Sequence, residues 1–219
     1  FCSRFLYDNG LIAAETSVID DDDALSILAR YTEEDEMKVA ESFKRRRDYF
    51  DIIFLSHLMH QIAYAHPKNL RLHADCLSAE DVKAMRNLCE LARTDFTPQS
   101  ITDIYLHAST YESMVQGAQM DYASLCLVMA LLRKMKLAKQ YEDYKRENKL
   151  VDFEDLLLLT YDALVADNEA VYRRYSWLQV DEVQDLNPLQ LAIVDAITDP
   201  NNPTVMFLGD EQQAIFSFM

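Results

Sequence analysis

Two short polar runs follow apolar segments near the end of the 219-residue chain. Residues 181–185, DEVQD, come directly after the apolar segment 177–180, and residues 209–213, GDEQQ, come directly after the apolar segment 205–208. Carboxylates are too costly to bury unpaired inside a sheet, but at its rim they can meet a cation. An Asp that holds Mg²⁺, followed by a Glu that takes a proton from water, is a pattern suited to nucleotide hydrolysis.

The elements around these runs predict where they lie. The two apolar segments read as strands, and Asn187-Pro188 opens a helix that continues to Ile197, with Pro at the favoured first position. A strand, a helix and a second strand within roughly 30 residues predict a βαβ unit with parallel strands. Sites in open parallel sheets form outside the carboxyl ends of the strands, and both polar runs lie at such ends.

The rest of the chain is predicted to be helical, because only three glycines and five prolines are available for turns. Caps and apolar periodicity predict helices over 1–8, from about 24, over 79–92, from 97, over 121–148 and over 153–166. They also predict one long helix over 32–66, whose apolar positions, Met37 and Phe43 among them, fit a 3.6-residue period with one slip. We therefore predict an α/β, mostly helical fold. Residues 1–11 and 146–219 form a partial parallel sheet with its helices, and residues 12–145 form a large all-α insertion.

Composition limits the function classes. The net charge is −16, and residues 151–219 carry 13 acidic against 2 basic side chains, so the overall field does not attract nucleic acid. No apolar run reaches the roughly 18 residues of a membrane span. The start shows no signal peptide, and the four irregularly spaced cysteines predict reduced thiols in a cytoplasmic protein. The first residue is Phe1 and not Met, so we expect the chain to be cut from something larger.

Specific segments resemble a known family. LQVDEVQDLNPLQ (178–190) resembles motif II, and VMFLGDEQQAIFSF (205–218) resembles motif III, of the UvrD/Rep-like superfamily 1 DNA helicases. FCSRFL resembles the stretch after motif Ib, and KLVDFEDLLLL resembles the helix before motif II. The resemblance covers 1–10 and about 145–219. It implies part of the first RecA-like domain, called 1A. The helices between these two stretches would lie where that family inserts its 1B subdomain.

The resemblance implies a role for each matching residue of the nucleotide site. Asp181 would hold Mg²⁺, directly or through water, and Glu182 would be the general base. Gln184 and Asp185 would organise the site and its link to the DNA channel. Gln213 would sense the γ-phosphate of ATP.

The resemblance also implies DNA as substrate. Phe216 and Phe218 match the aromatic positions on which the family stacks single-stranded bases, an interaction that tolerates any sequence. One short segment would then touch the nucleotide at Gln213 and the DNA at Phe216, so ATP hydrolysis can move the strand. The parent would be an ATP-dependent helicase or translocase that uses ATP and Mg²⁺, acting on single-stranded DNA and duplex junctions, with repair or recombination proteins as further partners. The branch, UvrD/Rep or AddA/RecB-like, and the presence of a nuclease domain stay open.

The sequence also departs from the family pattern. A phosphate-binding loop needs GxxxxGK[ST], yet none of Gly10, Gly117 and Gly209 is followed by Lys. The second RecA-like half is absent too, and Met219 stands where the family usually has Arg. We therefore expect the isolated chain not to hydrolyse ATP. The alternative function is a non-catalytic module, derived from a helicase, that binds DNA or protein; a third is a helical structural protein with chance motifs.

Each candidate also has a purely structural interpretation. Asp181-Glu182 could be a solvated turn, and Phe216 and Phe218 could be core residues. We interpret His57, His60 and His66 as one face of a helix, because no carboxylate or Cys has the spacing that a metal site would need. The basic runs 44–47 and 133–139 are interpreted as solvated helix faces, with phosphate contact as the alternative. The acidic run 20–23 is interpreted as a helix cap, with cation binding as the alternative.

Overall fold

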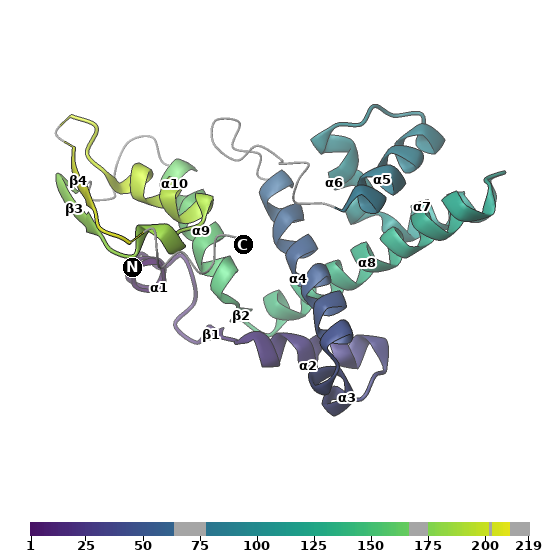
Figure 1. Cartoon of the computed structure of the whole chain (residues 1–219), viewed down its shortest axis with the longest axis horizontal. Helices are drawn as coiled ribbons and strands as arrows, with labels where there is room; N and C mark the ends of the chain where they lie inside the picture. Colours follow the sequence, from purple (N-terminus) through teal and green to yellow (C-terminus); the bar gives the residue numbers. More distant parts are fainter. Residues whose placement is uncertain (64–77, 167–174, 202, 211–219) are drawn as a thin grey trace. The chain divides into compact units, whose positions relative to one another are not determined.

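The computed structural model describes residues 1–63, 78–166, 175–201 and 203–210 (Figure 1). Helices dominate these residues, and two small parallel sheets accompany them. The predicted α/β, mostly helical class is therefore confirmed. The chain divides into two compact units, one made of residues 15–153 and the other of residues 1–14 and 154–219.

The unit of residues 15–153 is built around one long helix, α8 (Tyr122–Glu147), which contacts five other helices (Figure 1). These are α2 (Asp21–Thr32), α4 (Phe43–Ala63), α5 (Ala79–Ala92), α6 (Pro98–Leu106) and α7 (Ala108–Gln116). The short helix α3 (Glu36–Glu41) packs on α2 and α4.

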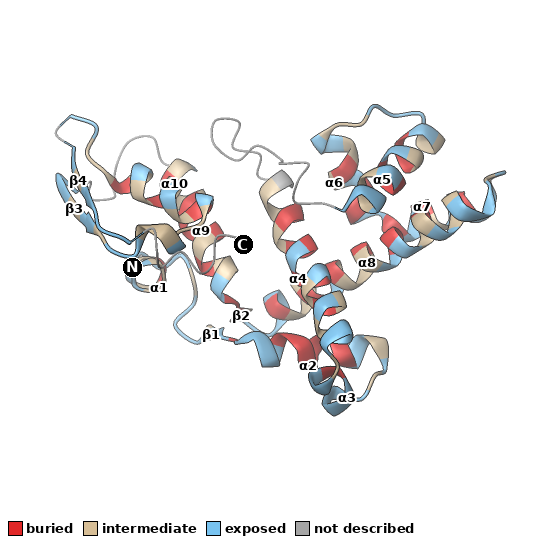
Figure 2. Ribbon diagram, viewed as in Figure 1, coloured by how far each residue is buried: buried red, intermediate tan, exposed pale blue. Residues whose placement is uncertain are grey.

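The core of this unit lies along α8, where buried residues recur along the helix (Figure 2). Leu131, Leu132, Met135, Ala138 and Tyr141 are each at most 1% exposed. They join one continuous apolar cluster with buried residues of the other helices.

Most predicted helix starts are confirmed at the capping residue. Asp20 accepts a hydrogen bond from the Asp23 backbone N–H, and the Asp23 side chain accepts the Asp20 backbone N–H in return, so the aspartates cap α2. Ser78, Thr97 and Asp121 likewise accept a backbone N–H at the starts of α5, α6 and α8.

The unbroken helix predicted over 32–66 is wrong. The chain leaves helical geometry at Ser42, whose φ and ψ are −97° and 109°, and α4 begins at the next residue. The Ser42 hydroxyl accepts the Arg45 backbone N–H, as a new cap does. The apolar face predicted across the break is wrong as well, because Met37 is 70% and Phe43 is 84% exposed. Pro67, the predicted end, lies outside the described residues.

Two features of this unit escaped prediction. Helix α7 begins at Ala108, and the preceding cap residue, His107, makes no side-chain cap hydrogen bond, so no local signal marks its start. Strands β1 (Ser17–Val18) and β2 (Leu150–Val151) form a parallel ladder, in which Ser17 N–H donates to Lys149 O and Ile19 N–H donates to Val151 O. This ladder joins the two ends of the unit, and two-residue strands are too short for a periodic pattern.

The second unit holds the predicted βαβ arrangement. Its elements are α1 (Cys2–Asp8), α9 (Phe153–Ala166), β3 (Trp177–Val180), the 3₁₀ turn η2 (Val183–Asp185), α10 (Pro188–Ile197) and β4 (Thr204–Phe207). Strands β3 and β4 pair in parallel with Val180 opposite Phe207, which confirms the predicted parallel strands. Helix α10 begins at a capping box between Asn187 and Gln190 and buries Leu189, Ile193 and Ile197 on one face.

Within the described ranges, no helix combines the length and the apolarity that crossing a bilayer requires. Cys2, Cys89 and Cys126 are free thiols, and Cys76 lies outside the described residues.

Candidate functional site

The two polar runs leave the β3–β4 sheet at the same edge. Asp181 and Glu182 follow the end of β3, and Gly209 and Asp210 come shortly after the end of β4. Because the strands are parallel and Val180 lies opposite Phe207, both chain segments emerge side by side. This edge is where open parallel sheets place their sites.

Backbone hydrogen bonds hold the two segments against each other beyond the last strand residues. Leu208 N–H donates to Val180 O at 2.8 Å, and Val183 N–H donates back to Leu208 O at 3.0 Å. The sheet pairing therefore continues into the site, and the positions of the two segments depend on one another.

The chain turns sharply at Glu182. Its φ of 53° and ψ of 41° lie in the left-handed region, which costs a non-glycine residue on the order of 1 kcal/mol. The Asp181 carboxylate accepts the Glu182 backbone N–H at 3.0 Å, and the Asp185 N–H donates to Glu182 O at 3.0 Å. The turn directs the chain into η2 and leaves both Asp181 and Glu182 exposed at the rim.

The donor set at this rim suits a hard cation. Mg²⁺ binds oxygen ligands and usually keeps several waters, so one or two protein carboxylates are enough. Asp181 and Glu182 offer adjacent exposed carboxylates, and neither has to leave an ion pair described in the structure to do so. The residues present therefore fit a Mg²⁺ ion, with the second carboxylate left to accept a proton from water.

Gln184 connects the two segments through its side chain. Its Nε2 donates to Glu182 Oε2, and its Oε1 accepts the Asp210 backbone N–H at 3.2 Å. The sequence predicted that Gln184 organises the site, but it did not identify the atoms that it bridges. The Asp185 side chain is exposed on η2. Gln213, Phe216 and Phe218 lie outside the described residues, so their roles remain predictions.

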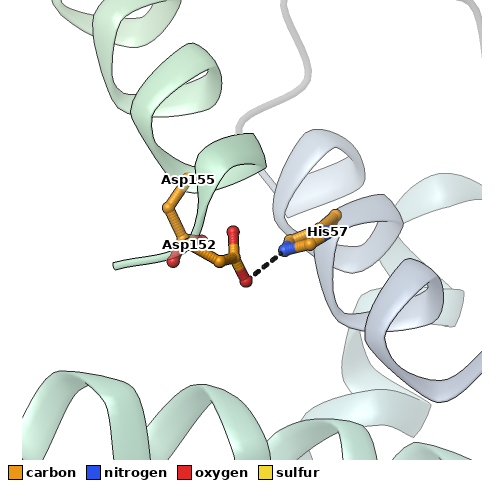
Figure 3. A group of neighbouring side chains, drawn as sticks. All are labelled: His57, Asp152 and Asp155. Carbon is orange, nitrogen blue, oxygen red and sulfur yellow. Dashed lines mark hydrogen bonds and ion pairs between the residues drawn. The ribbon is translucent and has the colours of Figure 1, made fainter. Parts of the chain in front are cut away.

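A polar cluster in the 15–153 unit was missed by sequence reasoning. His57 Nε2 lies 2.9 Å from Asp152 Oδ2, and Figure 3 marks this hydrogen bond with a dashed line. The same oxygen accepts from Tyr141 Oη at 2.9 Å and from Lys145 Nζ at 2.7 Å. Asp155, also drawn there, belongs to the other unit. No carboxylate at matching spacing was expected for His57, yet the structure brings one from 95 residues away.

This cluster is a buried ion-pair network. The side chains of His57, Asp152 and Lys145 are 12%, 11% and 5% exposed. Burial alone would raise the pKa of Asp152, but the hydrogen bond from His57 and the charge of Lys145 outweigh it and hold that pKa below its usual range. Through these contacts Asp152 links His57 on α4 to Lys145 on α8, so the cluster stabilises the packing of the unit.

The predicted basic faces are largely engaged within their own unit. Lys134 pairs with Asp81 at 2.9 Å, Lys136 with Glu112 at 2.6 Å, and Lys139 with Asp143. In the other run, Arg45 pairs with Glu34 and Arg46 pairs with Asp22. A phosphate would have to compete with these carboxylates, but an exposed ion pair is worth only about 0 to 1 kcal/mol, so the pairs do not decide between a solvated face and phosphate contact.

Comparison with known proteins identifies relatives. The family described as "UvrD/REP helicase N-terminal domain" matches residues 1–219. Among curated proteins, an ATP-dependent helicase/nuclease subunit from Lactobacillus gasseri is 30% identical over 90 residues, 38% of this chain. Its namesake from Natranaerobius thermophilus is 34% identical over 84 residues, 36% of this chain, and that from Clostridium perfringens (strain 13) is 29% identical over 128 residues, 52% of this chain. The matches cover only 8%, 7% and 10% of those relatives.

Proposed function

We propose that this chain, which belongs to the UvrD/REP helicase N-terminal domain family, is part of an ATP-dependent DNA helicase or translocase. In this proposal Asp181 holds Mg²⁺ and Glu182 is the general base that activates the attacking water. Gln213 senses the γ-phosphate, and Phe216 and Phe218 stack on single-stranded DNA. The whole protein uses ATP and Mg²⁺ to move on single-stranded DNA and to open duplex at a junction, in repair or recombination.

One observation carries the proposal. Asp181 and Glu182 stand exposed at the carboxyl edge of the parallel β3–β4 pair, beside the segment that leads to Gln213. Mg²⁺ would neutralise the charge that develops on the phosphates, while Glu182 accepts a proton from water. The backbone hydrogen bonds between the two segments support these roles, because they fix the carboxylates next to the segment proposed to contact nucleotide and DNA.

We assign the two units to the two parts of such a domain. The unit of residues 1–14 and 154–219 corresponds to part of the RecA-like 1A domain, and the unit of residues 15–153 corresponds to the helical 1B insertion. The β1–β2 ladder supports this assignment, because it brings the entry and exit of the insertion together. An insertion with adjacent ends can be accommodated in a host domain without distorting it.

The remaining catalytic parts must come from elsewhere in the protein. These 219 residues contain no GxxxxGK[ST] segment to hold the phosphates. Trp177, Met206 and Phe207 of the β3–β4 pair are 57%, 47% and 50% exposed, as expected of a sheet whose neighbouring strands belong to other segments. The isolated chain is therefore inactive in this proposal.

The test uses the whole protein that contains this chain. Glu182→Gln keeps the size of the side chain and removes the base, so we expect DNA-stimulated ATP hydrolysis to fall about 10²- to 10⁴-fold while nucleotide binding persists. Asp181→Asn should also abolish hydrolysis, and raising the Mg²⁺ concentration should recover part of it. Asp195→Asn, an exposed acid of α10, is the control and should leave hydrolysis unchanged. Unchanged hydrolysis in Glu182→Gln would contradict the proposal.

The second candidate is a non-catalytic module that binds DNA or protein, favoured by the missing phosphate-binding loop. It predicts salt-dependent binding of the chain to single-stranded DNA without ATP turnover by the whole protein. Phe216→Ala and Phe218→Ala should weaken that binding about 5- to 100-fold each if the rings stack on bases. DNA-stimulated turnover by the whole protein, lost in Glu182→Gln, would exclude this candidate.

A further inference from the structure

The carboxamide of Gln184 lies between the two segments of the candidate site. Nε2 donates to Glu182 Oε2, two residues before it, and Oε1 accepts the backbone N–H of Asp210, 26 residues after it. The two polar atoms of one carboxamide thus bind the proposed general base and the segment that follows β4.

The chemistry of the partners fixes the orientation of this amide. The Asp210 N–H is a donor and requires an acceptor, whereas the ionised Glu182 carboxylate only accepts and requires a donor. Only a side chain with both kinds of group at its tip can serve both partners. Glutamine does so, and the nearly isosteric Glu and Met do not.

Gly209 makes the space that the bridge occupies. A Cβ at position 209 would overlap Gln184 Oε1 and would lie 2.8 Å from Val183 Cγ1 and 3.3 Å from Val183 N. Real Cβ atoms essentially never approach within 3.0 Å of such neighbours. Any other residue at 209 would therefore push the two segments apart or displace the Gln184 side chain.

We propose that Gln184 is a positioning residue that ties the carboxylate of Glu182 to the backbone of the segment after β4, with Gly209 as the glycine that this bridge requires. This inference rests on the proposed role of Glu182. The segment after β4 leads in sequence to Gln213 and Phe216. A displacement of Asp210 would break its hydrogen bond to Gln184 Oε1 and free the carboxamide that holds Glu182. Through Gln184, the orientation of the Glu182 carboxylate depends on the position of that segment.

The first test measures ATP hydrolysis and hydrogen exchange in the whole protein. Gln184→Met removes both hydrogen bonds, so kcat should fall on the order of 10- to 100-fold with KM for ATP changed less than about twofold, because orientation and not binding is lost. A peptide containing Asp210 should also exchange its amide faster. Gln184→Glu keeps the acceptor for Asp210 and loses the donor to Glu182, so kcat should fall while the Asp210 amide stays protected.

The controls separate positioning from a general loss of structure. Gln179→Met makes the same change at an exposed position of β3 and should alter neither kcat nor exchange at Asp210. If Gln184→Met keeps the wild-type kcat while Glu182→Gln abolishes hydrolysis, the bridge is unimportant and the proposed function stands. If Glu182→Gln leaves hydrolysis unchanged, the proposed function fails, and the inference falls with it because no base needs positioning.

A double-mutant cycle tests the link to Gly209 independently. Gly209→Ala should lower kcat, since its Cβ overlaps the bridge. In a Gln184→Ala background the added Cβ meets less, so Gly209→Ala should have a clearly smaller effect there. The contact with Val183 remains, and the effect should not vanish. Fully multiplicative effects of the two substitutions on kcat would show that Gly209 does not act through Gln184 and would overturn this part of the inference.

Discussion

Replacing Asp152 by Asn should destabilise the unit of residues 15–153 strongly. Asp152 Oδ2 accepts from Tyr141, Lys145 and His57, and the Lys145 side chain is only 5% exposed. The amide of Asn preserves the shape but removes the negative charge that Asp152 places 2.7 Å from the buried Lys145 ammonium. Removing one partner of a buried ion pair costs about 3 to 5 kcal/mol. We expect about 3 kcal/mol here, because an Asn carbonyl oxygen in the place of Oδ2 can still accept hydrogen bonds from these donors, and the negative charge is what is lost.

Urea denaturation of the 219-residue chain, followed by far-UV circular dichroism, measures this loss. Two variants make the measurement specific. Glu36→Gln neutralises an exposed acid paired with Arg30, with side chains 50% and 64% exposed, and should cost less than about 0.5 kcal/mol. Lys145→Met in the Asp152→Asn background removes the buried ammonium that has lost the Asp152 charge and should recover part of the loss. A loss below about 1 kcal/mol, or no recovery with Lys145→Met, would refute the buried-charge reasoning.

The same network predicts a pH dependence. Because the pKa of folded Asp152 lies below its unfolded value of about 3.9, its ionisation stabilises the folded state above that pH. The contribution is lost as the pH falls through the folded pKa. The stability difference between wild type and Asp152→Asn should therefore be constant at neutral pH and should narrow below about pH 4. A difference that stays constant under acid would contradict the assigned pKa shift.

Three further outcomes are expected. Asn187→Ala removes the capping box of α10 and should cost about 1 kcal/mol, measurable in the denaturation of the unit that contains β3 and β4. The exposed Cys126 should react rapidly with a thiol reagent, whereas Cys89 should react only on unfolding, because burial shields it and raises the pKa of its thiol. Residues 15–153 expressed alone should unfold cooperatively, since β1–β2 joins their ends and the core lies within them; a chain without a cooperative transition would disprove this.

The sequence alone determined the features that depend on nearby residues. Asp20, Ser78, Thr97 and Asp121 cap helices through side chains that reach backbone groups only three positions away, so their pattern can be read directly. The βαβ unit was equally legible, because the strand, the Asn187-Pro188 start and the next strand follow one another. From parallel pairing it followed that Asp181 and Asp210 lie at one edge of the sheet.

The sequence pattern did not predict the helix break at Ser42. The apolar periodicity over 32–66 contained one irregular step, but it did not indicate that the backbone breaks at Ser42. The burial of Val39 on one side of the break and of Tyr49 on the other supports two separately packed helices. Packing against neighbouring helices decided the outcome, since helix propensity alone is a weak preference.

Only the tertiary structure decided which distant side chains meet. His57 and Asp152 are 95 residues apart, and nothing in the apolar periodicity of α4 points to Asp152, which lies between β2 and α9. Gln184 and Asp210 could be placed at the same edge, but the hydrogen bond between them depends on the left-handed turn at Glu182 and on the space beside Gly209. Such contacts are set by angstrom-scale packing of separate elements, whereas a sequence pattern specifies only the face or the edge on which a residue lies.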